Sequence, residues 1–344
     1  MDRAGECEDS PMTNSSLSKL FTRAVTHDRE LTIHLRRIFR AAQAGSGSAQ
    51  WEIGDHFSSG DLLIRDTNRA VEWFRRSIDS GFVPAMNDLA FALLTGSGVA
   101  RDELAAVGIF REAVKRGDVA AIANLGRCYL FGVGVKRSRQ RGALLLKKAA
   151  RLGFDIAAAE LAWAYSEGTY VSKSFPQSIP WPLDRKESLR WLRLGSRLGD
   201  ASAARELAFA YEQGNGVRRS SATAFRWMKR AAVLGDPESW HHLGWYYDAG
   251  IGTAFNPKQA ITWYRKSARI GDVASTFNIG VLYSNLEKTK RNKALAERWL
   301  KQAAALGHER ANLLLTSAHS RAKPHLGKCH AIRADSTYEN RSRR

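Results

Sequence analysis

Hydrophobic positions recur along the chain with a long and constant period. Each unit closes on a glycine, and these glycines are 36 residues apart except for one spacing of 46: Gly81, Gly117, Gly153, Gly199, Gly235, Gly271 and Gly307. A small residue earlier in each unit follows the same rule: Gly54, Ala90, Gly126, Ala162, Ala208, Gly244 and Gly280. Both series place ten extra residues in the fourth unit. Agreement between two independent series indicates a true repeat architecture.

Each unit has the pattern of two short helices. In the third unit Leu125, Gly126 and Tyr129 lie on one helix face, and Gly132 and Gly134 follow as a turn. The second helix carries paired apolar residues, and it ends on a glycine suited to a left-handed cap: Trp73–Phe74, Trp191–Leu192, Trp227–Met228, Trp263–Tyr264 and Trp299–Leu300. Such pairs bury their apolar faces only when stacked. The pattern therefore predicts an all-α, right-handed solenoid of about seven 36-residue helix-turn-helix repeats with half-repeat caps.

These motifs resemble a known family. The 36-residue unit, the L-G-x-x-Y core, the G-x-G-V turn and the W-Y-x-K-A-A-x-x-G close are similar to Sel-1-like repeats, which are relatives of tetratricopeptide repeats. The resemblance covers about residues 48 to 315. It implies a scaffold or adaptor that binds other proteins. Secreted members carry cysteine pairs across each repeat, and the absence of such pairs here implies a cytoplasmic setting.

The array leaves two ends that differ from it. We expect residues 1–16 to be a disordered N-terminus and residues 17–47 to form a capping helix, equivalent to a degenerate half repeat. Residues 48–315 are the repeat array, with an insertion at 170–183. Residues 309–319 look like a lone first helix, and from about Ser317 the chain turns polar and basic. We therefore expect a basic disordered tail over residues 316–344.

Composition narrows the class of protein. The 344 residues include 53 Lys and Arg against 34 Asp and Glu, a formal charge of +19, and 44% are apolar, so wholesale disorder is excluded. The three cysteines, Cys7, Cys128 and Cys329, are far apart and give no disulfide framework. No apolar run reaches the length of a membrane-spanning helix, and the first sixteen residues lack the features of a secretory signal. We expect a soluble, monomeric, intracellular protein.

One face of the first helices carries unexpected aromatic residues. The residue after each small residue points roughly 150° away from the apolar stripe, so a polar side chain is expected there. The seven units have Asp55, Phe91, Arg127, Trp163, Phe209, Trp245 and Val281 at this position. In the resembled solenoids it lines the concave groove. We interpret it as a partner-binding groove formed by Phe91, Arg127, Trp163, Arg205, Phe209, His241 and Trp245. The alternative is packing between neighbouring first helices, or against the insertion.

The insertion, YVSKSFPQSIPWPL, offers a second candidate. Its three prolines predict an extended loop that cannot continue a helix. Phe175 and Trp181 could gate the groove, or the loop could itself be a docking peptide. Alternatively, it is a surface loop whose Trp181 packs on the repeats.

A third candidate is a ladder of basic residues. Six residues before each closing glycine the side chain is always basic: Arg75, Arg111, Lys147, Arg193, Lys229, Arg265 and Lys301. These side chains suit the C-terminal ends of helices, and the resembled family shares the preference, so a structural role is expected. The alternative function is binding of nucleic acid or an anionic surface through this ladder and the basic tail.

No catalytic site is expected. The sequence shows no convergent acid, base, nucleophile or metal set, so we predict a non-enzymatic protein without cofactor or metal. The tail residues His325, Cys329 and His330 lack the scaffold that a zinc site needs. The G-x-G turns recur between helices, so they are hairpin turns and not phosphate cradles.

Overall fold

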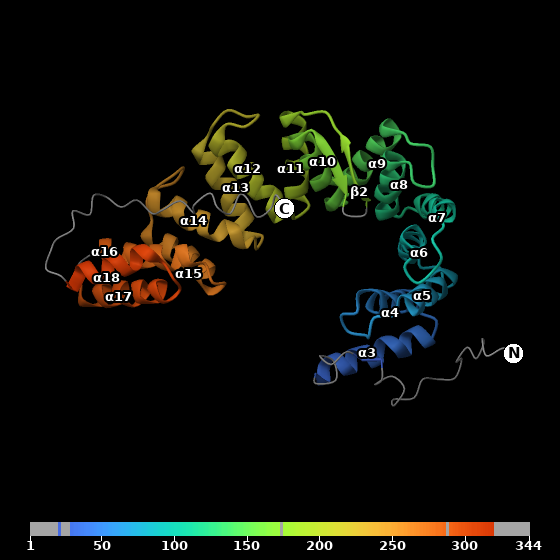
Figure 1. Ribbon diagram of the computed structural model, residues 1–344, viewed down its shortest axis with the longest axis horizontal. Coiled ribbons are helices and arrows are strands. Elements are labelled where there is room, and N and C mark those ends of the chain that lie inside the picture. Colours follow the sequence, from blue (N-terminus) through green and yellow to red (C-terminus); the bar gives the residue numbers. More distant parts are fainter. Residues whose placement is uncertain (1–19, 22–27, 173–174, 287–288, 320–344) are drawn as a thin grey trace. The chain divides into compact units, whose positions relative to one another are not determined.

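The computed structural model describes residues 20–21, 28–172, 175–286 and 289–319, which contain sixteen helices and two strands (Figure 1). The chain divides into two compact units. The first unit comprises residues 1–157 and 171–179, and the second comprises residues 158–170 and 180–344. We call the first helix of each repeat helix A and the second helix B. Among the described residues, no helix combines the length and apolar character needed to cross a membrane.

The first unit begins with one unpaired helix and continues as helix pairs. Its helices are α3 (Arg29–Gln43), the pair α4 (Gly47–Ser59) and α5 (Thr67–Asp79), the pair α6 (Pro84–Thr95) and α7 (Glu103–Lys115), and the pair α8 (Val119–Phe131) and α9 (Arg139–Arg151). Successive helices pack against each other in chain order. The expected capping segment is helical from Arg29 onward. Phe21, which precedes it, is buried and forms an isolated bridge to Leu63, so this part of residues 17–47 is not helical.

The second unit continues the same alternation. Its helices are α11 (Arg185–Arg197), α12 (Ala201–Gln213), α13 (Ser221–Val233), α14 (Pro237–Ala249), α15 (Pro257–Arg269), α16 (Val273–Asn285), α17 (Lys290–Ala305) and the lone helix A, α18 (Glu309–His319). Helix α10 (Asp155–Glu167) begins in the first unit and ends in the second. The chain is therefore an all-α solenoid of about seven repeats. The predicted disordered N-terminus, residues 1–16, and residues 320–344 of the predicted tail lie outside the described residues. Residues 316–319, which were expected to belong to the disordered tail, instead form the end of α18.

Local sequence signals explain where the helices start and stop. Most begin after an Asp, Ser, Asn or Thr whose side chain accepts a hydrogen bond from a backbone N–H of the first turn, as Asp118 does from Ala121 at 2.6 Å. Helices α4, α6, α8, α12 and α14 end on glycines with left-handed φ. In the following turn, a Cβ on Gly98 would lie 2.0 Å from the carbonyl oxygen of Thr67. The second glycine of the G-x-G turn is therefore needed for close approach between repeats.

The small residue of each helix A lets helix B approach. A Cβ on Gly54 would lie 2.7 Å from two ring atoms of Phe74, and one on Gly244 would lie 2.6 Å from the ring of Tyr264. Both rings are buried. The core of each unit thus consists of successive clusters of buried apolar side chains packed between helices A and B.

The insertion in the fourth repeat forms a two-stranded sheet. Strand β1 (Thr169–Ser172) pairs with β2 (Phe175–Pro180). The prolines predicted an extended loop; the extended backbone is present, but it is paired into strands. Side chains alternate in burial along β1, with Tyr170 and Ser172 buried and Val171 exposed. That period of two is the pattern of a strand with one face covered.

Candidate partner-binding surfaces on helices A

The aromatic side chains singled out in the sequence are partly exposed. Phe91 on α6 is 40% exposed, and Trp163 on α10 is 47% exposed. Phe209 on α12 and Trp245 on α14 are half-buried. Phe91 belongs to the first unit and the other three belong to the second. In the second unit, Phe209 meets His242 of α14 edge to face, with ring centroids 5.1 Å apart. The side chains of α12 and α14 therefore form adjoining parts of one surface.

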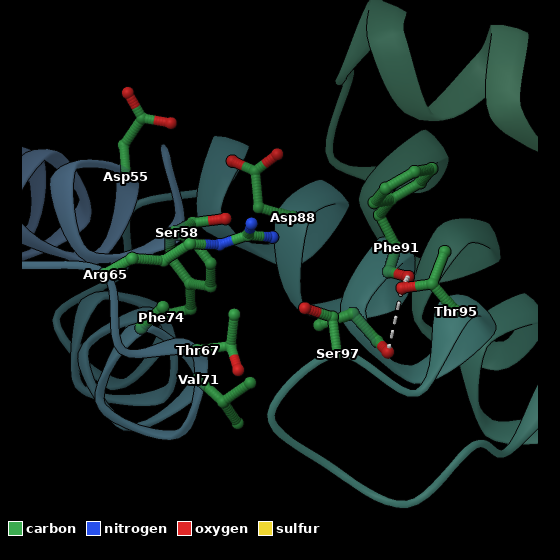
Figure 2. Close-up of a pocket in the computed structure, with 12 residues that line it drawn as sticks. Asp55, Ser58, Arg65, Thr67, Val71, Phe74, Asp88, Phe91, Thr95 and Ser97 are labelled. Atoms are coloured by element: carbon green, nitrogen blue, oxygen red, sulfur yellow. Dashed lines mark hydrogen bonds between the residues drawn. The ribbon is translucent and has the colours of Figure 1, made fainter. Parts of the chain in front are cut away.

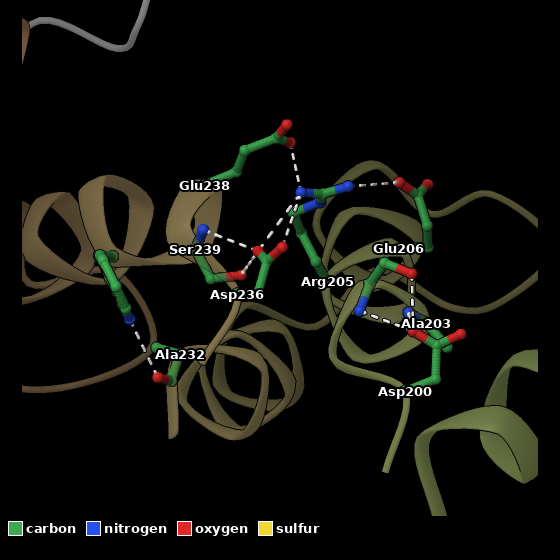
Figure 3. A network of polar contacts seen from close by, with 10 residues as sticks. Asp200, Ala203, Arg205, Glu206, Ala232, Asp236, Glu238 and Ser239 are labelled. Carbon is green, nitrogen blue, oxygen red and sulfur yellow. Dashed lines mark hydrogen bonds and ion pairs between the residues drawn. The ribbon is translucent and has the colours of Figure 1, made fainter. Parts of the chain in front are cut away.

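The predicted charge partner Arg205 is occupied by carboxylates of its own chain (Figure 3). Its guanidinium lies 3.1 Å and 3.3 Å from the two carboxylate oxygens of Asp236, forms an ion pair with Glu238, and lies 3.8 Å from Glu206. Asp236 is also the N-cap of α14 and accepts the backbone N–H of Ser239 at 2.8 Å. Arg205 therefore fixes the start of the next helix A.

His241 has the same role one repeat later. Its side chain is buried, and its Nδ1 lies 3.0 Å from Asp272 Oδ2 and 2.9 Å from Ser275 Oγ. Burial alone would raise the pKa of Asp272, but hydrogen bonds from His241 and Ser275 hold it well below its usual range. The helix A position of Arg205 and His241 thus joins successive repeats. The sequence had predicted that both side chains would face a bound partner.

Arg127 is also turned into its own unit. The side chain is only 5% exposed and donates a hydrogen bond to Asn124 Oδ1. Asn124 in turn donates to Asn87 of α6 at 2.7 Å. The sequence pattern predicted Arg127 on the surface, but the side chain is buried and bonded to Asn124 of its own helix α8, which is bonded to α6. The charged side chain of Arg127 therefore lies in the interior of the first unit.

Acidic residues that were not among the predicted site residues lie beside the partly exposed aromatic side chains. Glu206 precedes Phe209 by three residues, and Asp88 precedes Phe91 by three, so each pair shares a helix face. The pKa of Glu206 is raised by burial and by the neighbouring carboxylates of Glu238 and Asp236, against the lowering effect of Arg205. The sequence signal that would have found them is a carboxylate three residues before an aromatic residue.

Charge separates strongly between the two kinds of helix. The seven helices A, α4 to α16, carry two basic and ten acidic side chains, a net −8. The seven helices B, α5 to α17, carry 27 basic and six acidic side chains, a net +21. The strongly basic sequence therefore contains acidic helices A. The excess of acidic side chains lies in α4, α6, α10, α12 and α14, whereas α8 is net +1 and α16 carries no charged side chain.

A pocket of about 380 Å³ lies in the first unit between α4 and α6 (Figure 2). Its lining includes Asp55, Arg65, Phe74, Asp88 and Phe91. Burial raises the pKa of Asp88, and the charge of Asp55 raises it further, while a hydrogen bond from the indole of Trp51 opposes both effects. That hydrogen bond, from Trp51 Nε1 to Asp88 Oδ2, is 2.6 Å long. The pocket thus combines two carboxylates, one guanidinium and an aromatic wall.

Trp181 of the insertion, which was expected to gate the groove, is packed inside the protein. Trp181 is buried, with its ring centroid 5.7 Å from that of Tyr165 and 5.4 Å from that of Tyr170. Its backbone N–H donates to the carbonyl of Gly168 at 2.7 Å. This is the packing alternative considered from the sequence. Phe175 begins strand β2, and its side chain is outside the described part of the structure.

The basic ladder has specific contacts within the chain. Arg193 donates to the hydroxyl of Tyr211 at 3.0 Å, and Arg265 donates to the hydroxyl of Tyr283 at 2.9 Å. A hydrogen bond from Arg111 lowers the pKa of Tyr129 in the same way. In each pair the cation on a helix B holds the tyrosine of the next helix A. Three of the seven ladder residues therefore have a structural contact of the kind expected from the sequence.

The chain belongs to the Sel1 repeat family. Seven consecutive segments match the Sel1 repeat: residues 47–82, 83–118, 119–154, 155–200, 201–236, 238–272 and 273–308. Proteins with this repeat are generally protein-interaction scaffolds. No curated protein matches the chain.

Two solved bacterial structures illustrate what the chain is similar to. One is c5321, a protective antigen of uropathogenic Escherichia coli with an SLR fold, at 26% identity and a TM-score of 0.59. The match covers 84% of this chain and 60% of that one. Another is a Sel1 repeat protein from Oxalobacter formigenes, at 24% identity and a TM-score of 0.49, covering 74% of this chain and 98% of that one.

Proposed function

We propose that the chain is a non-enzymatic scaffold or adaptor that holds a segment of a partner protein on helices A of its second unit. The observation that supports this proposal is that Trp163, Phe209 and Trp245 remain partly exposed at a helix position that points away from the apolar stripe, where a polar side chain is expected. Partly exposed aromatic side chains are typical anchors for a protein partner, because they bury much apolar area on binding.

The surroundings of these anchors favour a particular kind of segment. Glu206 and Glu238 lie beside Phe209 and His242, and together with Asp236 they outnumber the single cation Arg205. The partner segment we propose is therefore apolar with neighbouring basic residues. Arg127, Arg205 and His241 act indirectly, because they hold successive helices A in register. The absence of repeat-spanning cysteine pairs supports a reducing, cytoplasmic setting, and we propose that the protein acts as a monomer.

The proposal is tested by selecting peptides that bind the whole chain and measuring them against paired variants. We expect Trp163→Ala with Trp245→Ala to weaken the selected peptides at least tenfold. The matched control is Val233→Ala with Phe255→Ala, two exposed apolar residues of the same unit that lie outside helices A. Circular dichroism verifies folding in both cases. Equal affinity for both double variants would contradict the proposal.

Salt separates this function from the alternative. An aromatic surface should lose little affinity between about 50 and 200 mM salt, whereas a phosphate-dominated contact should weaken by orders of magnitude. Capture from lysate that disappears with added salt or nuclease would instead indicate the basic surface of helices B.

A further inference from the structure

We propose that the pocket between α4 and α6 binds the cationic side chain, arginine or lysine, of a partner segment. The pocket lies wholly in the first unit, so this inference does not depend on the aromatic surface of the second unit. Its volume of about 380 Å³ is in the range of sites that hold small ligands, about 300–1,000 Å³.

The pocket has an uncompensated negative charge. Among the described residues, Asp55 forms no hydrogen bond or ion pair, and Asp88 accepts hydrogen bonds only from the neutral groups of Trp51 and Asn87. Arg65 extends along the pocket but forms no ion pair with either carboxylate in this part of the structure (Figure 2). Two carboxylates and one guanidinium leave one negative charge, which a single cation would balance.

The walls distinguish an organic cation from a metal ion. Phe91 has an exposed ring at the pocket, and Phe74 and Val71 add apolar surface. A guanidinium or ammonium group is attracted to an aromatic face, and the methylene stem of Arg or Lys covers apolar surface. A hard metal ion instead needs six or more oxygen ligands, and the described residues contain no group of three possible ligands. The pocket therefore fits a long basic side chain.

The raised pKa of the Asp88 carboxyl also favours a cationic ligand. Burial of its carboxylate and the charges of Asp55 and Asp118 raise its pKa, against hydrogen bonds from Trp51 and Asn87. A bound cation would stabilise the ionised form of Asp55 and Asp88. Binding should therefore weaken as the pH falls and Asp88 takes up a proton.

The test uses blocked amino acids as probes of the full chain. N-acetyl-arginine amide and N-acetyl-lysine amide are titrated at millimolar concentrations, and N-acetyl-citrulline amide serves as the neutral analogue of arginine. Backbone amide NMR shifts report where each probe binds. We expect saturable shifts on α4 and α6 with both cationic probes, and at least tenfold weaker binding of citrulline.

Two variants test whether a carboxylate of the pocket is needed to bind the cationic probe. Asp55→Asn removes an exposed carboxylate of the pocket, and we expect at least a tenfold loss of affinity for arginine amide. Asp79→Asn removes an exposed carboxylate of α5 outside the pocket and should leave the affinity unchanged. Citrulline that binds as well as arginine, or equal loss in both variants, would overturn the proposal. Shifts confined to α12 and α14 would overturn it as well, and would leave the aromatic surface untouched as a separate proposal.

Discussion

The close contact between helices A and B can be measured with two glycine substitutions in the first unit. Gly54 lies in α4, where an added Cβ would approach two atoms of the buried Phe74 ring to 2.7 Å. Gly108 lies in α7, where an added Cβ meets no atom within 4 Å. Replacement by alanine increases helix propensity by about 1 kcal/mol at either site. Only at Gly54 must the packing adjust.

The expected magnitudes follow from these two contributions. Gly108→Ala should stabilise the first unit by about 1 kcal/mol, since only helix propensity changes. Overpacking a tight core costs about 1–3 kcal/mol. Gly54→Ala should therefore be neutral or destabilising by up to about 2 kcal/mol once the propensity gain is subtracted. The two variants should differ by about 1–3 kcal/mol, the overpacking cost alone.

Urea unfolding of the full chain, together with hydrogen exchange of the α4, α5 and α7 amides, measures this difference. A double variant, Gly54→Ala with Phe74→Leu, adds a control, because the smaller side chain should remove most of the clash. The reasoning is refuted if Gly54→Ala raises the unfolding midpoint as much as Gly108→Ala. It is also refuted if the Phe74→Leu background does not reduce the effect.

Three further predictions concern other described residues. Trp181→Ala should destabilise the second unit by about 3–5 kcal/mol in urea unfolding, because the ring is buried against Tyr165 and Tyr170; a loss below 1 kcal/mol would assign the ring no packing role. Burial raises the pKa of the Cys128 thiol to about 12, so maleimide should label it only after unfolding in a chain without other cysteines. The raised pKa of Asp88 means that its ionisation disfavours the folded state. The stability of the natural chain relative to Asp88→Asn should therefore fall as the pH rises through the carboxyl range, and an opposite slope in unfolding between about pH 3 and 7 would contradict this.

The fold could be predicted because its signals are local and repeated. The small residue of helix A and the closing glycine recur in every unit, and the G-x-G turn recurs in four of them. The small glycines of helix A and the second glycines of the turns mark close approaches between helices, whereas the closing glycines adopt a left-handed φ. The insertion was harder to predict. Its prolines indicated an extended segment, but the pairing of β1 with β2 depends on which side chains are covered, such as Tyr170, and the repeat pattern does not contain that information.

The candidate site was predicted only in part. Periodicity identified the helix A face of Phe91, Trp163 and Trp245, and these residues are partly exposed. It did not identify what the charged residues contact. Arg205 and His241 bind Asp236 and Asp272, each 31 residues further along and at the start of the next helix A. Such pairing depends on the angle between repeats, which a single-helix projection does not include.

The acidic helices A have a kinetic consequence in a chain that carries an overall +19. A basic partner segment is repelled by the whole chain at long range and attracted only within about 8 Å, the screening length at physiological salt. Moderate salt should weaken the distant repulsion first. The association rate of such a segment should then rise with ionic strength, while its dissociation rate also rises. Encounter should therefore be slower in dilute buffer than at the salt concentration of a cell.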